Sequence, residues 1–141
     1  AVAAHEEQAW LPVKNVADVE RHIAESDRLV ILDLYADWCI SCKTMERDVF
    51  PEPEVARQLG RFTLLRADVT ANDDQDRALL SEYGLFGPPS LVFFAEDGVE
   101  IADVRIQGEV TADTLSAHLL AVLSLIFELN LEIFPYLLIY L

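Results

Sequence analysis

Several residue types are scarce in this chain of 141 residues, and each shortage excludes a class of protein. It has only two cysteines, five glycines and one methionine. Two cysteines exclude a disulfide-rich scaffold and supply only half of a tetrahedral zinc site. The three histidines, His5, His22 and His118, are scattered and not set at ligand spacing. We therefore expect no metal site.

Basic side chains are also scarce. The chain has 10 lysines and arginines against 25 acidic residues, and its formal net charge is −15. Such a surface repels phosphate backbones and anionic lipid head groups. The sequence has neither a G-x-x-x-x-G-K-[ST] loop nor a G-x-G-x-x-G loop to bind phosphates. We expect no nucleic-acid partner and no nucleotide cofactor.

The chain also lacks repeats and flexible low-complexity tracts, and 52% of its residues are hydrophobic. This composition and length predict one compact domain. Residues 1–10 have neither the basic nor the apolar segment of a signal peptide. Two origins stay open: a cytoplasmic protein, or a processed piece of a longer exported one.

Residues 121–141 form a very apolar tail. Polar residues and a proline interrupt it at Glu128, Asn130, Glu132 and Pro135, so no run reaches the roughly 18 to 20 residues of a membrane span. We therefore divide the chain into a domain over 1–120 and an apolar extension over 121–141. The extension either packs on the domain or a partner, or is a terminus foreign to the domain.

Hydrophobic periodicity and turn signals predict an alternation of helices and strands. Helices are expected over 16–25, capped by Asn15, and from Cys39 to about Phe50, with a short continuation that ends at Gly60. A third helix, capped by Asn72, runs to Gly84, and a last one is capped by Thr111. Strands are expected over 29–35, 62–67, 90–95 and 99–106, the last two joined by Glu96-Asp97-Gly98.

This order joins a βαβ half to a ββα half. The almost continuous apolar run over 29–35 is typical of a central strand buried on both faces. Parallel strands joined by right-handed helical crossovers then give a mixed sheet with helices on both faces. We predict an α/β protein with the thioredoxin fold.

The segment Trp38-Cys39-Ile40-Ser41-Cys42 follows the central strand and opens a helix. Free backbone N–H groups and the helix dipole favour a thiolate at Cys39, while Cys42 lies one turn later and is more buried. Cys39 would attack and Cys42 would resolve. A purely structural disulfide is the alternative, but a loop this short stabilises a fold by only about 2 kcal/mol.

Two acidic residues near the cysteines are further candidates for the site. Asp33 lies inside the apolar strand, where a charge is costly to bury without a task or partner. Glu46 falls on the same helix face as both cysteines. Nearby carboxylates raise a thiol pKa and oppose the helix dipole. We hypothesise that they protect the dithiol and that Asp33 exchanges a proton; a hydrogen-bonded core acid and a solvated surface acid are the alternatives.

A proline pair precedes the third strand, and Pro89 at the strand entry is typical of a cis peptide bond. A cis Pro89, with Pro88 before it, would leave backbone free to pair with an extended substrate. Trp38 and Tyr35 are either core residues or parts of the surface that binds a protein substrate. An ordinary trans turn at Pro89 remains the alternative.

The chain resembles the C-terminal periplasmic domain of the DsbD family of thiol:disulfide interchange proteins. The likeness covers about Leu11 to Leu119. It depends on Tyr-Ala-Asp-Trp-Cys at 35–39, on Val-Thr-Ala-Asn-Asp at 69–73 and on Gly-Pro-Pro at 87–89. The Cys-x-x-Cys alone marks only the thioredoxin superfamily, whereas the first two motifs are more specific. The tail after Leu120 has no counterpart in the family.

The resemblance implies a periplasmic relay module in an inner-membrane protein. Such a domain receives electrons from a membrane-embedded domain and passes them to an N-terminal periplasmic domain. The resemblance assigns the nucleophile to Cys39, its partner to Cys42, the tuning acids to Asp33 and Glu46, and the cis proline to Pro89. No cofactor is implied beyond the cysteine pair. A general thioredoxin with many substrates and a non-catalytic binding module are the rival functions.

Overall fold

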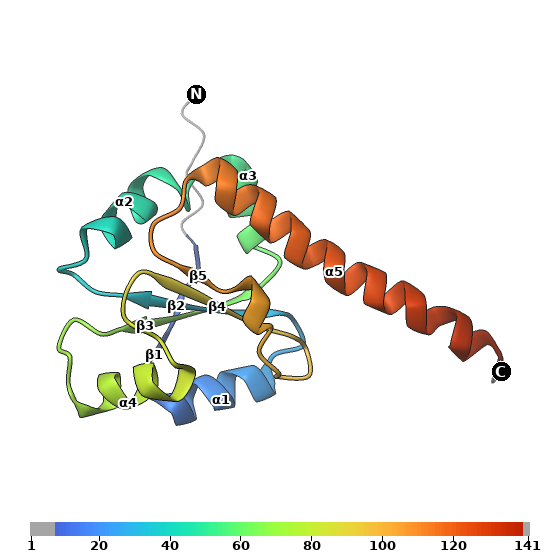
Figure 1. The fold of residues 1–141 in the computed structure, drawn as a ribbon, viewed down its shortest axis with the longest axis horizontal. Coiled ribbons are helices and arrows are strands. Elements are labelled where there is room, and N and C mark those ends of the chain that lie inside the picture. Colours follow the sequence, from blue (N-terminus) through green and yellow to red (C-terminus); the bar gives the residue numbers. More distant parts are fainter. Residues whose placement is uncertain (1–7, 140–141) are drawn as a thin grey trace.

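The computed structural model describes residues 8–139 and, in the last helix, side chains as far as residue 125. Its centre is a five-stranded sheet in the order β1-β3-β2-β4-β5 (Figure 1). β1 and β2 run parallel to β3, whereas β4 is antiparallel to β2 and β5 to β4. The strands are β1 (Leu11–Val13), β2 (Val30–Tyr35), β3 (Thr63–Asp68), β4 (Ser90–Phe94) and β5 (Ile106–Gln107).

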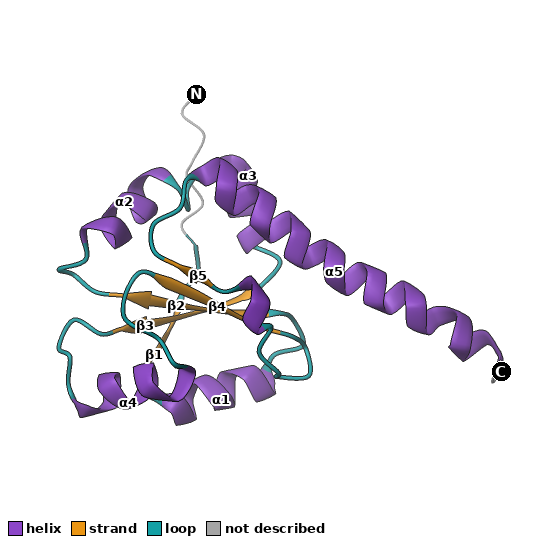
Figure 2. Cartoon of the chain, in the orientation of Figure 1, coloured by secondary structure: helices purple, strands orange, loops and turns teal. Residues whose placement is uncertain are grey.

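Helices cover both faces of this mixed sheet, as Figure 2 shows. α1 (Val16–Glu25) and α4 (Asp74–Tyr83) lie on one side. α2 (Ile40–Asp48), α3 (Pro53–Leu59) and α5 (Ala112–Ile139) lie on the other. The prediction of an α/β protein with a mixed sheet between two helical layers is therefore confirmed.

β2 is the central strand and is buried along its whole length. Because side chains alternate along a strand, Leu32 and Leu34 join one hydrophobic cluster, with the α1 and α4 residues Val19 and Leu79. Ile31 joins the other cluster, whose helical members from α2, α3 and α5 include Met45, Leu59 and Leu115. Packing on both faces fixes the end of β2 from which the cysteine segment starts.

Most of the predicted helix boundaries are confirmed. The Asn15 side chain accepts a hydrogen bond from Asp18 N at 2.9 Å and caps α1. The Thr111 hydroxyl accepts from Thr114 N at 3.2 Å at the start of α5. Gly84 ends α4 with a φ of 60°, a left-handed conformation that glycine adopts without a steric penalty.

The predicted cap of α4 is wrong by one residue. Asp73, not Asn72, is the N-cap, and its side chain accepts a hydrogen bond from Asp76 N at 2.9 Å. Asp76 returns the contact by accepting from Asp73 N at 3.1 Å. Asn72 instead has a φ of 48°, in the left-handed region that asparagine tolerates better than most residues. The reciprocal pair of carboxylates satisfies two backbone N–H groups, which a cap at Asn72 would not do.

Two strands differ from the prediction. The strand expected over 99–106 is limited to β5, because the chain makes one bridge at Glu100 and then turns through a short 3₁₀ helix at Ala102–Val104. Ala102 and Asp103 have low β-propensity and interrupt the alternation. β1 was not predicted, since three residues with a central Pro12 give no readable period. Its place at the sheet edge tolerates the missing N–H.

α5 continues through residue 120 without a break. Val122, beyond that position, is buried in the same cluster as Leu115 and Leu119. The division between a domain over 1–120 and an extension over 121–141 stays a prediction, and the side chains of 126–139 lie outside the described residues, as do His5 and residues 140–141. Within the described part of the chain, no helix has both the length and the hydropathy of a membrane span.

Candidate functional site

Three connections of the chain meet at one end of the sheet. β2 ends there and leads to α2, β3 ends there and leads to α4, and β4 begins there (Figure 1). The register pairs Leu34 with Ser90, and Val69 N donates to Tyr35 O at 2.8 Å after the two parallel strands. This end of the sheet therefore brings the cysteines together with the proline pair.

Cys39 and Cys42 form a disulfide, with Cα atoms 5.2 Å apart. Cys39 is the N-cap residue of α2, and its sulfur accepts a hydrogen bond from Cys42 N at 3.1 Å. Cys42 Sγ lies 4.0 Å from the carbonyl oxygen of Leu34 in β2. Because an N–H donor and the positive end of a helix dipole favour an anion, the position suits a thiolate at Cys39 in the reduced state.

Both sulfur-bearing residues have little contact with solvent in this disulfide form. Cys39 is 6% exposed and Cys42 4%, so Cys42 is more buried, as predicted, but only slightly. The residues on either side of Cys39 are far more open, with Trp38 59% and Ile40 83% exposed. A partner protein would therefore approach the disulfide over the surface that Trp38 and Ile40 form.

Asp33 and Glu46 are brought together by a residue from a third element, Arg66 of β3. Arg66 Nε donates to Asp33 Oδ2 at 2.8 Å, and its Nη1 donates to Glu46 Oε1. The guanidinium also lies over two aromatic rings, 4.9 Å from the centroid of Trp10 and 4.8 Å from that of Tyr35. The two acids thus share one cation on the face of the sheet that α2 covers.

Burial dominates the electrostatics of Asp33. Loss of water around the carboxyl raises the pKa of Asp33 to about 6, with a smaller upward contribution from the charge of Glu46. Arg66 opposes the rise through its charge and its hydrogen bond. Asp33 therefore changes its charge near neutral pH, which is the range a proton-exchanging acid needs.

The two aromatic candidates have different surroundings. Tyr35 is buried, and its hydroxyl donates to Asp37 Oδ1 at 3.0 Å and receives a hydrogen bond from Lys43 Nζ. Trp38 is exposed, but its Nε1 donates to the backbone oxygen of Thr70 at 3.1 Å. The Trp38 ring is therefore held in place beside Cys39.

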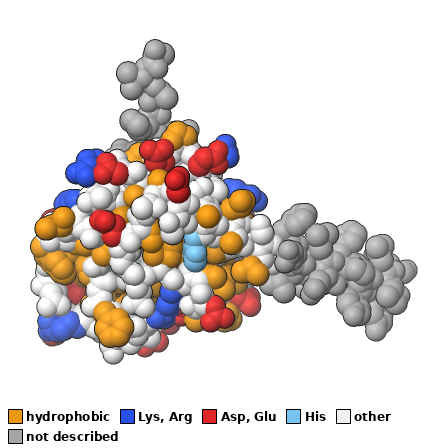
Figure 3. Space-filling model, turned by 45° about the horizontal axis from the view of Figure 1, so that its top comes forward, with side chains coloured by type: hydrophobic (Ala, Val, Ile, Leu, Met, Phe, Trp, Pro, Cys, Tyr) orange, Lys and Arg blue, Asp and Glu red, His pale blue; other side chains and the backbone are white. Residues whose placement is uncertain are grey.

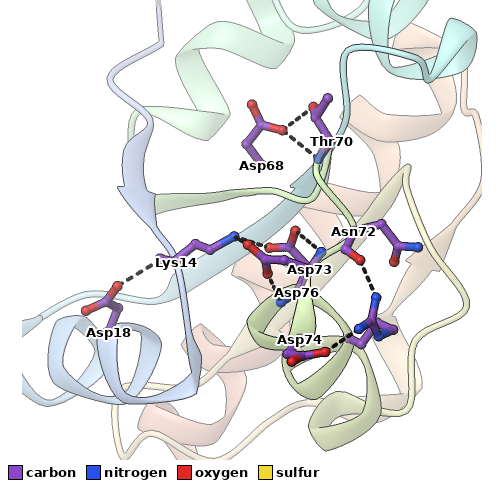
Figure 4. Close-up of polar contacts among 9 residues, drawn as sticks. Lys14, Asp18, Asp68, Thr70, Asn72, Asp73, Asp74 and Asp76 are labelled. Carbon is purple, nitrogen blue, oxygen red and sulfur yellow. Dashed lines mark hydrogen bonds and ion pairs between the residues drawn. The ribbon is translucent and has the colours of Figure 1, made fainter.

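Thr70 belongs to the β3–α4 loop, which is itself held by charged side chains (Figure 4). Thr70 N donates to Asp68 Oδ1 at 2.9 Å, and the Thr70 hydroxyl accepts from Asp37 N at 2.9 Å. At the other end of the loop, Lys14 Nζ lies 2.8 Å from Asp73 and 2.6 Å from the buried carboxylate of Asp76. The loop thus connects the β1–α1 corner to the segment before Cys39.

The bond between Pro88 and Pro89 is cis, so the predicted cis proline is confirmed. Both prolines are partly exposed. Phe86, three residues before Pro89, is 95% exposed. Two segments at this end of the sheet therefore present apolar side chains to solvent, one around Cys39 and one just before β4.

Comparison with known proteins identifies the family. The family model of the thioredoxin-like domain matches residues 16–123. The crystal structure of the reduced DsbD C-terminal domain of Neisseria meningitidis is 38% identical, with a TM-score of 0.62, and covers 73% of this chain and 89% of its own. The chain belongs to the DsbD C-terminal domain family. A thioredoxin from Thermus thermophilus, 22% identical with a TM-score of 0.63, shares the fold.

Full-length DsbD proteins show the same relationship. The thiol:disulfide interchange protein DsbD of Pectobacterium atrosepticum is 46% identical over 110 residues, and DsbD 1 of Pseudomonas aeruginosa is 42% identical over 113. Each match covers 78% of this chain but 19% of the relative. The chain therefore spans about a fifth of these relatives, and its fold and cysteine pair are those of a thiol–disulfide oxidoreductase.

Arg66 is the residue of this DsbD-type site that sequence reasoning missed. The signal was available: a single basic residue stands in the apolar run of β3, as a single acidic residue stands in that of β2. The parallel register sets Asp33 directly opposite Arg66. Opposite charges in two adjacent buried strands predict a pair. Phe86 was also missed as a surface residue.

The described residues contain no cluster of three or more histidine, cysteine or acidic side chains that could hold a metal ion. His118 is half-buried, and its Nε2 is 2.7 Å from Val104 O. Its ring packs against Phe93, with centroids 5.5 Å apart. This histidine therefore belongs to the packing of α5 on the sheet.

Proposed function

We propose that this chain carries electrons from a membrane-embedded redox domain to a periplasmic partner domain by thiol–disulfide exchange. The Cys39–Cys42 disulfide at the N-terminus of α2, in a member of the DsbD family, carries the proposal. The matched segment covers only 19% of the relative, which supports further domains as partners. We place the chain in the periplasm as a domain of an inner-membrane protein, with the cysteine pair as its only redox group.

The exchange consists of two displacement steps. The Cys39 thiolate attacks one sulfur of the partner's disulfide, which forms a mixed disulfide and releases the other partner sulfur as a thiolate that takes up a proton. The Cys42 thiolate then attacks Cys39 Sγ, which closes the Cys39–Cys42 bond and releases the second partner thiol. The partner gains two electrons and the chain loses two, which a donor dithiol restores.

Asp33 accepts the proton that Cys42 must lose before it attacks. Its burial and its pKa of about 6 support this role, as does its place in β2. The carbonyl oxygen of the next residue, Leu34, lies 4.0 Å from Cys42 Sγ. Glu46 acts with Asp33 because both hold the same guanidinium. The negative pair disfavours thiolates at rest and so protects the dithiol.

The surface around the cysteines binds the partner. Figure 3 shows hydrophobic side chains gathered at the left margin of the molecule, the side on which the β2–α2 connection lies in Figure 1. From the segments around Cys39 and before β4, the partly or fully exposed Trp38, Pro88 and Pro89 form the binding surface, and the exposed Ile40 and Phe86 extend it. Apolar side chains in the open suit a complementary apolar patch on a protein. Tyr35, also predicted to bind substrate, is buried and reaches this surface through Lys43 and Asp37.

Trapping of the mixed disulfide tests the proposal. A Cys42→Ser variant lacks the resolving sulfur, so it is expected to accumulate a covalent complex with the separate N-terminal periplasmic domain of a DsbD relative. Cys39→Ser is the matched control and should form none. Failure of Cys42→Ser to form the complex, with Cys39 still open to an alkylating reagent, would reject the relay.

Two measurements distinguish the rival functions. Equilibration with a dithiothreitol or glutathione buffer gives the redox potential of the cysteine pair, and an insulin assay gives the rate at which the chain reduces an unrelated protein. A strongly reducing Cys39–Cys42 potential with slow insulin reduction supports the relay, because such a domain serves few partners. Rapid reduction of insulin and of many unrelated disulfides would indicate a general thioredoxin. A chain that reduces neither insulin nor the partner domain would be a non-catalytic binding module.

A further inference from the structure

We propose that Arg66 is a positioning residue for the exchange reaction: it holds Asp33 and Glu46 as one unit beneath α2 and thereby sets the pH range in which Asp33 accepts a proton. The inference rests on the proposed exchange at Cys39 and Cys42. It assigns a function to a side chain that touches neither sulfur in the contacts of this structure.

The geometry holds the guanidinium from several sides. Asp33 of β2 and Glu46 of α2 bind two of its nitrogens, and the rings of Trp10 and Tyr35 stack on it. The side chain is only 18% exposed. Because planar guanidinium binds two carboxylates at fixed angles, Arg66 sets both the charge and the direction of the acids. Lysine would supply the charge without the fork.

Packing alone does not account for an arginine at this position. Its Nη2 is buried and has no hydrogen-bond partner within the described residues. An unsatisfied buried donor costs free energy, and buried ion pairs are often no more stabilising than apolar residues of the same volume. A role of this charge at the site would explain why an arginine is present despite that cost.

The task follows from the opposing effects on Asp33. Burial and the charge of Glu46 favour the protonated carboxyl, and Arg66 favours the carboxylate. Without Arg66, Asp33 would keep its proton at neutral pH and could not accept another. Arg66 therefore keeps the acceptor available where exchange takes place.

Other charged groups surround the unit, and their contributions have to be separated from that of Arg66. On α2, the ammonium of Lys43 binds the Tyr35 hydroxyl, which raises the pKa of Lys43, and the charge of Glu46 raises this pKa further. On the β1 side, the shallow pocket beside Arg66 is lined by the charged residues Lys14, Asp18 and Asp68. The Lys14 ammonium is bound to Asp73 and Asp76 and is thereby engaged elsewhere.

The test uses the full chain with Arg66→Gln, and with Arg66→Lys in case the first variant does not fold. NMR of the side-chain carboxyl, assigned with Asp33→Asn, gives the titration midpoint of Asp33 directly. The midpoint should rise by about one pH unit or more in Arg66→Gln and by less in Arg66→Lys. An unchanged midpoint in a folded variant would overturn the proposal.

The rate of disulfide exchange against pH is the second readout. In Arg66→Gln its acidic limb should move upward with the Asp33 midpoint. A one-unit shift lowers the rate about tenfold on that limb, while the rate at high pH stays within about twofold of the parent. A purely structural role would lower the rate equally at every pH, which would reject the proposal.

An Asp33→Asn background provides the control. If Arg66 acts through Asp33, the substitution Arg66→Gln should not move the pH profile of an Asp33→Asn chain. An equal shift in both backgrounds would show that Arg66 acts by another route. The proposed function and the role of Arg66 can fail independently. If the parent chain exchanges no disulfides, the proposed function is wrong, whereas the carboxyl titration still shows whether Arg66 controls Asp33.

Discussion

At the scale of single residues, the buried carboxyl of Asp33 has a consequence for stability that can be measured. Its pKa is about 6 in the folded protein and near the ordinary value of 3.8 when unfolded. The folded state therefore binds more protons between these values, so this residue favours folding most below pH 4. The contribution is lost as pH rises towards 6.

We expect Asp33→Asn to flatten that dependence. Relative to the parent, the free energy of unfolding of Asp33→Asn should gain roughly 2 to 3 kcal/mol between pH 4 and pH 7.5. Urea unfolding of the disulfide form over this range gives the values. Loss of the contact with Arg66 would lower the free energy of unfolding by the same amount at every pH, which would not change its slope against pH.

Asp18→Asn is the matched control, and its free energy of unfolding relative to the parent should stay constant between pH 4 and pH 7.5. The hydrogen bond from Lys14 N holds the pKa of Asp18 below its usual value, so the Asp18 contribution is present above pH 4 and is lost in acid. Parallel stability curves for Asp33→Asn and the parent would contradict a raised Asp33 pKa.

The residues of the site differ in how visible they are in the sequence. Cys39, Cys42 and Pro89 stand in local motifs, and Asp33 is conspicuous as a charge in an apolar run, so their positions could be predicted. The contact of Asp33 with Arg66 depends on the register of two strands that are 33 residues apart. Local patterns do not fix such a register until the fold is known.

At the scale of elements, the sequence predicted the helices and strands that have an extended hydrophobic pattern or a clear N-cap. β2 and helices α1, α2 and α4 were found because their apolar faces extend over several residues. β1 is only three residues long, and β5 only two. Their pairing comes from neighbouring strands and not from their own composition, so tertiary context decides them.

The capping box of α4 should contribute more to stability than the exposed acids around it. Asp76 is buried, accepts from Asp73 N and binds Lys14. Asp76→Ala leaves that N–H without its acceptor and should lower the free energy of unfolding by about 2 kcal/mol. Thermal or urea unfolding measures the loss.

Asp74→Ala is the control within the same helical turn. Asp74 is almost fully exposed and pairs with the exposed Arg77 on the surface. Exposed ion pairs contribute little, so this variant should unfold at the same denaturant concentration as the parent. Equal losses for Asp74→Ala and Asp76→Ala would show that the loop does not depend on the buried carboxylate.

The end of the folded domain can be tested within α5. Val122 lies beyond the predicted boundary at residue 120, yet it packs in the core, whereas Leu120 is exposed. Val122→Ala should cost about 1 to 2 kcal/mol, because it removes two buried methyl groups. Leu120→Ala should leave stability unchanged in the same urea titration. Equal, negligible effects would place the end of the core at or before residue 120.

At the scale of the whole molecule, charge is the most unusual property of the chain. A net charge of −15 acts on every molecule that approaches the disulfide. The Debye length is about 30 Å at 0.01 M salt and about 8 Å at 0.15 M, so the field of the whole protein is felt only at low ionic strength. Small thiols of different charge can report this field, because they reduce the same disulfide.

We expect the salt dependence of the reduction rate to increase with the negative charge of the attacking thiolate. Anionic glutathione is repelled, so its rate should rise by about threefold between 0.01 and 0.15 M salt. The attacking thiolate of mercaptoethanol carries a single negative charge and should show a smaller rise, whereas the ammonium group of cysteamine balances its thiolate, so its rate should change little. Stopped-flow measurement of the change in tryptophan fluorescence follows each reaction, since Trp38 adjoins Cys39. If all three thiols showed the same salt dependence, the net charge would not govern access, and the local pair Lys43 and Asp37, 3.7 Å apart, would control the field at the disulfide.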